Sequence, residues 1–235
     1  HLSDTTDVAG VKLVATQSTP GGNEITVSMQ TPGITGYWDL GLARKALTNE
    51  TTFINPIPGK VTFKYVGTLG SQFFTKTIDV QIDKLDHRLD QDYYDLVSEN
   101  TVAGKDWVFD GTGGSGKLWW FMSPGGNPDG AMTAWWNAGD CCGPSDATGK
   151  MHFDLNGDAN YNHYETMTST AEKGTFSLDR ANKKLTIIGS KMLGSAAGNK
   201  DGVYTIVELT QTKMVLYLSN SETYGTGWTF VFKPL

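Results

Sequence analysis

The clearest strand signal in the chain is TKTIDVQID at residues 75–83, where polar and apolar side chains alternate with a period of two. This alternation is typical of a strand with one face in a core and one face in water. Shorter apolar runs separated by turn residues, such as TPGGN at 19–23, occur along both halves of the chain. No segment has the length and spacing of a helix that crosses between parallel strands. The sequence therefore predicts an all-β protein.

The composition fits many short strands joined by tight turns. Hydrophobic residues make up 38% of the 235 residues and charged residues only 19%, and 28 residues are glycine. Glycine adopts the positive φ that tight turns need, and a chain of this length is long enough for two hydrophobic cores. The formal net charge is -6, and lysine and arginine are scattered without a basic run. This charge pattern argues against a nucleic-acid partner and against a polybasic membrane-binding patch.

The chain is expected to divide into two domains at a short helical segment. Near-helical spacing of apolar residues marks that segment, at Leu85, Leu89, Tyr93 and Leu96. We predict a β-sandwich over residues 1–86, a linker with a short helix over 87–100, and a second β-domain over 101–235. For the second domain we expect a jelly-roll-like β-sandwich, with an eight-stranded lipocalin-like barrel as the alternative.

Motifs in both halves resemble a known arrangement. GYWDLG at 36–41, PIPGKVTF at 56–63 and KTIDV at 76–80 resemble the elements of a PKD-type β-sandwich, with Leu40 where that family has phenylalanine. KDWV at 105–108, MHFDLNG at 151–157 and WTFVFK at 228–233 are similar to the C-terminal β-domains that follow such modules in outer-surface lipoproteins of gut Bacteroidetes.

The resemblance implies an extracytoplasmic location on the outer-membrane surface, a lipid tether and the capture of glycans. It carries over no catalytic residues. The chain has no run of 18 apolar residues, so we expect contact with a membrane only through a tether outside this sequence. The polar residues 1–7 are interpreted as the end of that tether. The oligomeric state is left open.

Paired tryptophans are the first candidates for a ligand site. Sugar C–H faces pack on indole rings while neighbouring amides and carboxylates bind hydroxyl groups. Because adjacent residues on a strand point to opposite faces, we expect one of Trp119 and Trp120 in the core and one outside. The candidate carbohydrate-binding residues are Trp119, Trp120, Trp135, Trp136, Asn137, Asp140, Cys141 and Cys142. Trp135 and Trp136 lie in a glycine-rich loop and are the preferred platform.

The only two cysteines are adjacent, at Cys141 and Cys142, so no disulfide framework is possible within the chain. They are either free thiols or a vicinal disulfide, which would offer a rigid stacking surface beside the tryptophan pair. A catalytic cysteine is not expected, because neither has a histidine near it in sequence.

A second candidate site is a calcium loop. Asp154, Asn156 and Asp158 have the spacing of calcium ligands, and Glu165 stands at the twelfth position. However, Ala159 replaces the glycine of such loops, and a β-hairpin turn at Asn156 and Gly157 explains the same residues. Calcium is the one cofactor that the sequence suggests.

These observations predict a non-catalytic surface protein that binds a polysaccharide or oligosaccharide. One alternative is a glycoside hydrolase or lyase using Glu165 or Glu208. A second alternative is a lipocalin-like carrier of an apolar molecule, whose barrel would begin at the segment Lys105, Asp106 and Trp107. The last is an adhesion or scaffolding protein without a small ligand.

Overall fold

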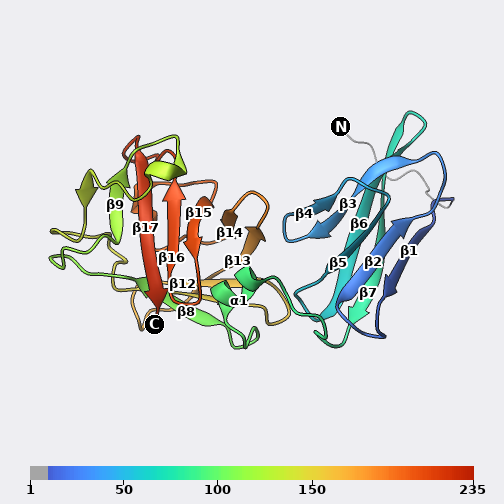
Figure 1. Ribbon diagram of the computed structural model, residues 1–235, viewed down its shortest axis with the longest axis horizontal. Helices are drawn as coiled ribbons and strands as arrows, with labels where there is room; N and C mark the ends of the chain where they lie inside the picture. The colour runs from blue at the N-terminus through green and yellow to red at the C-terminus, as the bar shows by residue number, and fades with distance from the viewer. Residues whose placement is uncertain (1–9) are drawn as a thin grey trace. The chain divides into compact units, whose positions relative to one another are not determined.

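The computed structural model describes residues 10–235 and divides into two compact units, one up to Leu89 and one from Asp90 to Leu235 (Figure 1). Both units are built from β-strands, as the sequence predicted. The division falls just before the short helix α1 (Gln91–Val97), which therefore belongs to the second unit and not to a separate linker. Within residues 10–235, no helix is long and apolar enough to cross a bilayer.

The first unit is a sandwich of a three-stranded and a four-stranded antiparallel sheet, in the orders β1-β2-β5 and β4-β3-β6-β7. Its strands are β1 (Leu13–Gln17), β2 (Glu24–Met29), β3 (Thr35–Gly41), β4 (Arg44–Ala46), β5 (Glu50–Ile54), β6 (Gly59–Leu69) and β7 (Gln72–Ile82). One hydrophobic cluster joins the inner faces of both sheets and includes Val27, Trp38 and Phe63. Burial of these apolar side chains between the sheets holds them together.

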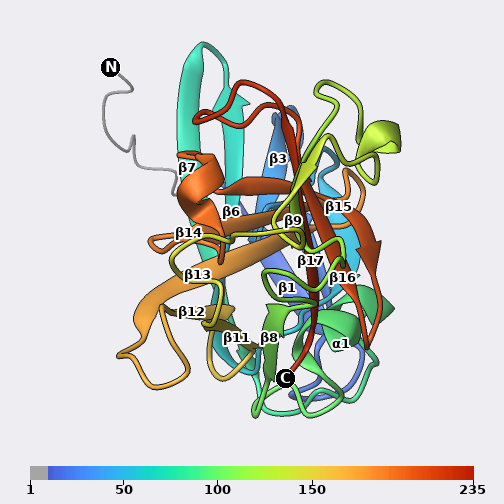
Figure 2. The same cartoon turned by 90° about the vertical axis from the view of Figure 1, so that its left-hand side faces the viewer.

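The second unit contains ten strands. They are β8 (Lys105–Phe109), β9 (Trp120–Ser123), β10 (Trp136–Asn137), β11 (Lys150–Asp154), β12 (Asn160–Tyr164), β13 (Glu172–Asp179), β14 (Lys184–Ile188), β15 (Val203–Leu209), β16 (Met214–Leu218) and β17 (Gly227–Pro234). Two short 3₁₀ helices interrupt the loops, η1 (Pro128–Gly130) and η2 (Ser195–Ala197). Figure 2 shows β11 to β15 following one another around this unit.

Eight of these strands close into a barrel. The antiparallel order β8-β11-β12-β13-β14-β15-β16-β17 returns to its start because the end of β17, from Phe232 to Pro234, pairs with β8. The beginning of β17, from Gly227 to Phe230, pairs with β9, and β10 extends that edge. The topology thus differs from the two-sheet jelly roll that we expected first. It has the closed form of the lipocalin-like barrel that was our alternative, because each of the eight barrel strands pairs with the next barrel strand along the chain.

Large side chains point into the barrel. Residues on β11 and β12 alternate between buried and partly exposed, so that Met151, Phe153 and Tyr161 face inward and are fully buried. A barrel of eight strands has an interior just wide enough for side chains. Helix α1 contacts β11 and β15 and lies near the C-terminus (Figure 2). The indole nitrogen of Trp107 donates a hydrogen bond of 2.9 Å to the carbonyl of Leu96 on that helix.

Candidate functional site

Three exposed aromatic side chains occur where β9, β10 and the loop between β16 and β17 meet. Trp135 is 59% exposed, Trp136 is 37% exposed and Tyr224 is 45% exposed. Met122 of β9 pairs both with Trp136 of β10 and with Trp228 of β17, so the register of the three strands brings these segments together. We call Trp135, Trp136 and Tyr224 the aromatic rim.

Buried rings support the aromatic rim from below. Tyr224 stacks on Trp228 with ring centres 4.4 Å apart and an interplanar angle of 17°. Trp136 lies 6.0 Å from Trp228 and 6.0 Å from Trp120, both of which are buried. Because Trp228 covers one face of Tyr224, the exposed surface of Tyr224 belongs to its other face and its edge. The buried indole nitrogen of Trp228 has no hydrogen-bond partner.

Backbone hydrogen bonds hold the rim segments in place. The amide of Trp135 donates to the carbonyl of Met122 at 2.8 Å, and the amide of Thr223 donates to the carbonyl of Ala197 at 3.0 Å. The amide of Tyr224 also donates to the hydroxyl of Ser221 in the same loop. A ligand that binds here therefore meets rings already held in position, which lowers the entropic cost of binding.

The other tryptophan pair does not contribute to the exposed rim. Trp119 is 0% exposed and Trp120 is 3% exposed, so our expectation that one of them faces solvent is wrong. Strand β9 begins only at Trp120, and Trp119 lies in the irregular backbone before it, where strand alternation does not apply. Trp119 packs its ring edge-on against Phe109 with centres 4.9 Å apart.

The polar residues predicted beside the platform have different roles. Asn137 is buried, and its amide donates to the carbonyl of Lys117 while its oxygen accepts from the amide of Gly139. The side chain therefore stabilises a turn and is not available for a ligand hydroxyl. Asp140 is exposed to solvent.

The two cysteines form a disulfide with each other. Cys141 and Cys142 are both exposed, and their sulfur atoms are bonded. Of the two states that the sequence left open, the structure shows the vicinal disulfide. A bonded cysteine has no thiolate, so neither residue is a nucleophile in this state.

The four residues of the predicted calcium loop do not come together. Asp154 accepts hydrogen bonds from the amide of Asn156 and the side chain of Asn160, and Gly157 has a φ of 76°, as a tight hairpin turn requires. Asp158 accepts from the amide of the next residue. Strand β12 separates this turn from Glu165, and its five residues span about 16 Å. The calcium prediction is therefore wrong, and the competing hairpin interpretation is confirmed.

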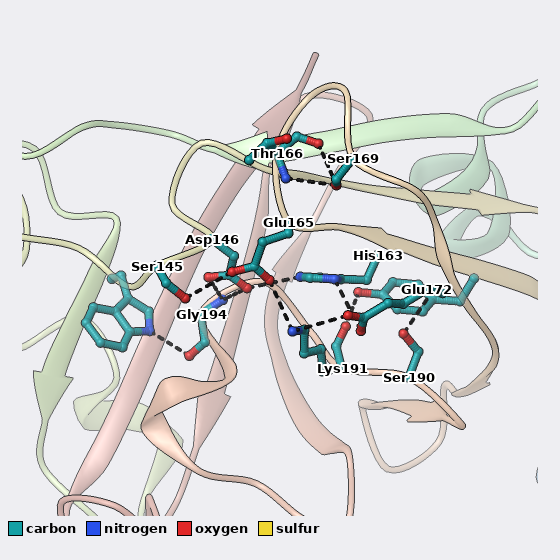
Figure 3. Close-up of polar contacts among 12 residues, drawn as sticks. Ser145, Asp146, His163, Glu165, Thr166, Ser169, Glu172, Ser190, Lys191 and Gly194 are labelled. Atoms are coloured by element: carbon teal, nitrogen blue, oxygen red, sulfur yellow. Dashed lines mark hydrogen bonds and ion pairs between the residues drawn. The ribbon is translucent and has the colours of Figure 1, made fainter.

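A polar cluster of Asp146, His163, Glu165, Glu172 and Lys191 surrounds the end of β12; we call it the His163 cluster (Figure 3). The imidazole of His163 is fully buried, and its Nε2 lies 3.0 Å from Oδ2 of Asp146. Its Nδ1 faces a carboxylate oxygen of Glu172 at 3.6 Å and has no hydrogen-bond partner.

Lys191 lies between two carboxylates of the His163 cluster. Its Nζ is 3.1 Å from Glu165 and 3.4 Å from Glu172. The hydrogen bond from Lys191, with a further one from Ser145, lowers the pKa of Glu165 below its ordinary value. Burial opposes the charged form of Lys191, but the hydrogen bond to Glu165 and the two nearby carboxylates raise its pKa overall. Glu165 therefore remains ionised near neutral pH.

A separate polar cluster lies on the outer face of β8 and β11, beside an open depression of about 690 Å³. His152 places Nδ1 2.7 Å from Asp106 and Nε2 3.3 Å from Asp154. The hydrogen bond to Asp106 raises the pKa of His152, although burial opposes it. The Lys150 ammonium lies 2.8 Å from the second oxygen of Asp106.

Sequence reasoning identified two of the three residues of the aromatic rim but missed most of the His163 cluster. It named Trp135 and Trp136 but not Tyr224, which carries no signal beyond its place in the turn-rich segment SNSETYGTG at 219–227. It named Glu165 but assigned it to the wrong partners, because Asp146 and Lys191 reach it from distant parts of the chain. In comparisons with known proteins, no family model and no curated sequence matches this chain.

Proposed function

We propose that the second unit binds a polysaccharide or oligosaccharide at the aromatic rim without transforming it. The observation that carries this proposal is the exposure of Trp135, Trp136 and Tyr224, of which two rest on the buried ring of Trp228. Sugars pack their C–H faces on aromatic ring faces, and an uncharged partner suits a chain with a net charge of -6.

A further feature supports this proposal over a structural interpretation of the same rings. Singly exposed apolar residues are normal on protein surfaces, but several rings gathered at one end of a fold indicate a binding site.

The first unit serves in this proposal as a PKD-like spacer of a surface lipoprotein. Its two-sheet architecture is compatible with that family, and the disulfide between Cys141 and Cys142 is compatible with an oxidising, extracytoplasmic compartment. A lipid tether outside this chain would hold the protein at the outer-membrane surface.

Hydrolysis of the bound glycan is less well supported. A glycosidase needs a carboxylic acid whose pKa is raised, so that it donates a proton near neutral pH. The ammonium of Lys191 instead lowers the pKa of Glu165. Glu208, the other candidate, lies 2.8 Å from the ammonium of Lys213.

A carrier of an apolar molecule is the second candidate function, because the closed eight-stranded topology favours it. Against it, fully or almost fully buried rings point into the barrel, among them Phe153, Tyr161 and Phe230. A fluorescent fatty-acid probe distinguishes the two functions. Tight binding of that probe, retained after Tyr224→Ala, would favour the carrier over the glycan-binding protein.

The proposal is tested by electrophoresis of the whole chain through gels that contain a panel of neutral polysaccharides. We expect at least one polysaccharide to retard the wild type, and Trp135→Ala or Tyr224→Ala to remove that retardation. Phe73→Ala is the matched control, because Phe73 is 65% exposed in the first unit. No retardation by any polysaccharide, or full retardation of both rim variants, would contradict the proposal.

A further inference from the structure

We propose that Asp146, His163 and Glu165 bind a divalent transition-metal ion such as Zn²⁺. This inference concerns the His163 cluster and does not depend on carbohydrate binding at the aromatic rim. One nitrogen or oxygen atom from each of the three side chains lies within 4.8 Å of the others. An imidazole with two carboxylates is a donor set that suits zinc and related ions.

The distances need little adjustment to hold an ion. Ligand atoms about 2.1 Å from a tetrahedral zinc are about 3.4 Å from one another. Nε2 of His163 and Oδ2 of Asp146 are already 3.0 Å apart. Figure 3 shows the carboxylate of Glu165 at the same end of the imidazole as Asp146, and this side chain is 40% exposed. Glu165 therefore has the freedom to close on an ion that enters from solvent.

The unpartnered nitrogen of His163 gives independent support. Nδ1 is buried, has no hydrogen-bond partner and faces Glu172 at 3.6 Å, at the other end of the ring (Figure 3). Metal-bound histidines usually donate their second N–H to a carboxylate, which fixes the tautomer and orients the ring. With an ion on Nε2, Nδ1 carries the proton and a small movement of Glu172 completes this arrangement.

The backbone fixes the orientation of Asp146. Both of its carboxylate oxygens accept hydrogen bonds from the amide of Gly194, at 3.0 and 3.1 Å. Gly194 has a φ of 78°, and a Cβ there would lie 2.7 Å from the indole nitrogen of Trp120. Only glycine fits this position without strain. The close packing around Gly194 fixes the position of its amide, and this amide in turn orients the carboxylate of Asp146.

The charge of the cluster also favours a dication. Three carboxyl groups, those of Asp146, Glu165 and Glu172, surround His163, and among the described residues the ammonium of Lys191 is the one lysine or arginine group paired with them. Carboxylates in excess over ammonium groups favour the binding of a divalent cation. Lys191 is 39% exposed and is able to move toward Glu172 as the ion enters.

The cluster around His152 lacks this geometry. Its two carboxylates, Asp106 and Asp154, face different nitrogens of the ring, at 2.7 and 3.3 Å. One ion therefore cannot reach both carboxylates through a single imidazole nitrogen. This makes His152 a suitable internal control for the assignment.

The test is a calorimetric titration of ZnCl₂ into the metal-free whole chain in a non-chelating buffer. We expect one ion to bind per chain. Glu165→Gln, which removes a ligand, should abolish binding or weaken it more than Glu172→Gln does. We expect Glu172→Gln, which removes the carboxylate that faces Nδ1 of His163, to weaken binding about 10- to 100-fold.

Glu208→Gln is the matched control, because Glu208 is 42% exposed and lies 2.8 Å from Lys213, much as Glu165 pairs with Lys191. This variant and His152→Gln should bind Zn²⁺ like the wild type, and circular dichroism should show that every variant is folded. The proposal is overturned if the wild type binds no Zn²⁺ or if Glu165→Gln binds it unchanged. Loss of binding in His152→Gln alone would also overturn it.

Discussion

Replacing one tryptophan from each pair separates rings that stabilise the fold from rings that are free to bind. Trp119 is 0% exposed and contacts Phe109, and a Cβ added to Gly143 would collide with its indole ring. Trp135 is 59% exposed. Truncation of a fully buried tryptophan to alanine costs about 3–5 kcal/mol, because contacts are lost and a cavity remains. Truncation of the exposed ring should change the free energy of unfolding by less than about 0.5 kcal/mol.

Urea denaturation followed by tryptophan fluorescence measures this difference. Six of the seven tryptophans lie in the second unit, and Trp38 is the only one in the first, so the signal reports mainly on the barrel. With a urea dependence of about 2 kcal/mol per molar, Trp119→Ala should lower the transition midpoint by about 1.5–2.5 M. Trp135→Ala should shift it by less than about 0.25 M.

The first unit provides an internal reference, because its unfolding should be the same in both variants. A midpoint for Trp119→Ala within about 0.5 M of the wild type would refute the structural role assigned to this ring. A large shift for Trp135→Ala would refute its assignment as a ring free to contact a ligand.

Two further predictions concern stability. The raised pKa of His152 means that its pairing with Asp106 stabilises the fold fully below about pH 6.5 and that this contribution is lost as the pH rises through the folded pKa. The destabilisation by Asp106→Asn in urea should therefore shrink between about pH 5.5 and pH 9, and an unchanged destabilisation would contradict the pairing. Gly194→Ala, at a φ of 78° and against Trp120, should lower the free energy of unfolding by at least about 1–2 kcal/mol, and a thermal midpoint equal to the wild type would contradict this.

Local patterns predicted the strands well because they depend on neighbouring residues. Residues 75–82 of the alternating segment form the C-terminal part of β7. Of the four residues with near-helical spacing, Tyr93 and Leu96 lie in α1 (Gln91–Val97), whereas Leu85 and Leu89 lie before it. The barrel was harder to foresee, because its closure depends on the pairing of β17 with β8, which are more than 100 residues apart. Strand lengths and turn signals are alike in a jelly roll and in a closed barrel.

In the candidate site, too, local sequence patterns failed to predict contacts between residues that are far apart in the chain. Exposure of Trp135 follows from its loop, but burial of Trp119 depends on Phe109 and Gly143, which no local pattern connects to it. The spacing that suggested calcium was read along the sequence, whereas β12 carries Glu165 to the opposite end of the hairpin. There it meets Asp146 from the preceding loop.

Carbohydrate binding at the aromatic rim is tested most directly by the affinity of Tyr224→Ala for a soluble oligosaccharide of the polysaccharide that retards the wild type. Loss of one stacked ring should weaken binding at least about tenfold, which corresponds to about 1.4 kcal/mol. Phe73→Ala should bind like the wild type. Equal dissociation constants for wild type and Tyr224→Ala, with the barrel folded in both, would contradict the proposed site.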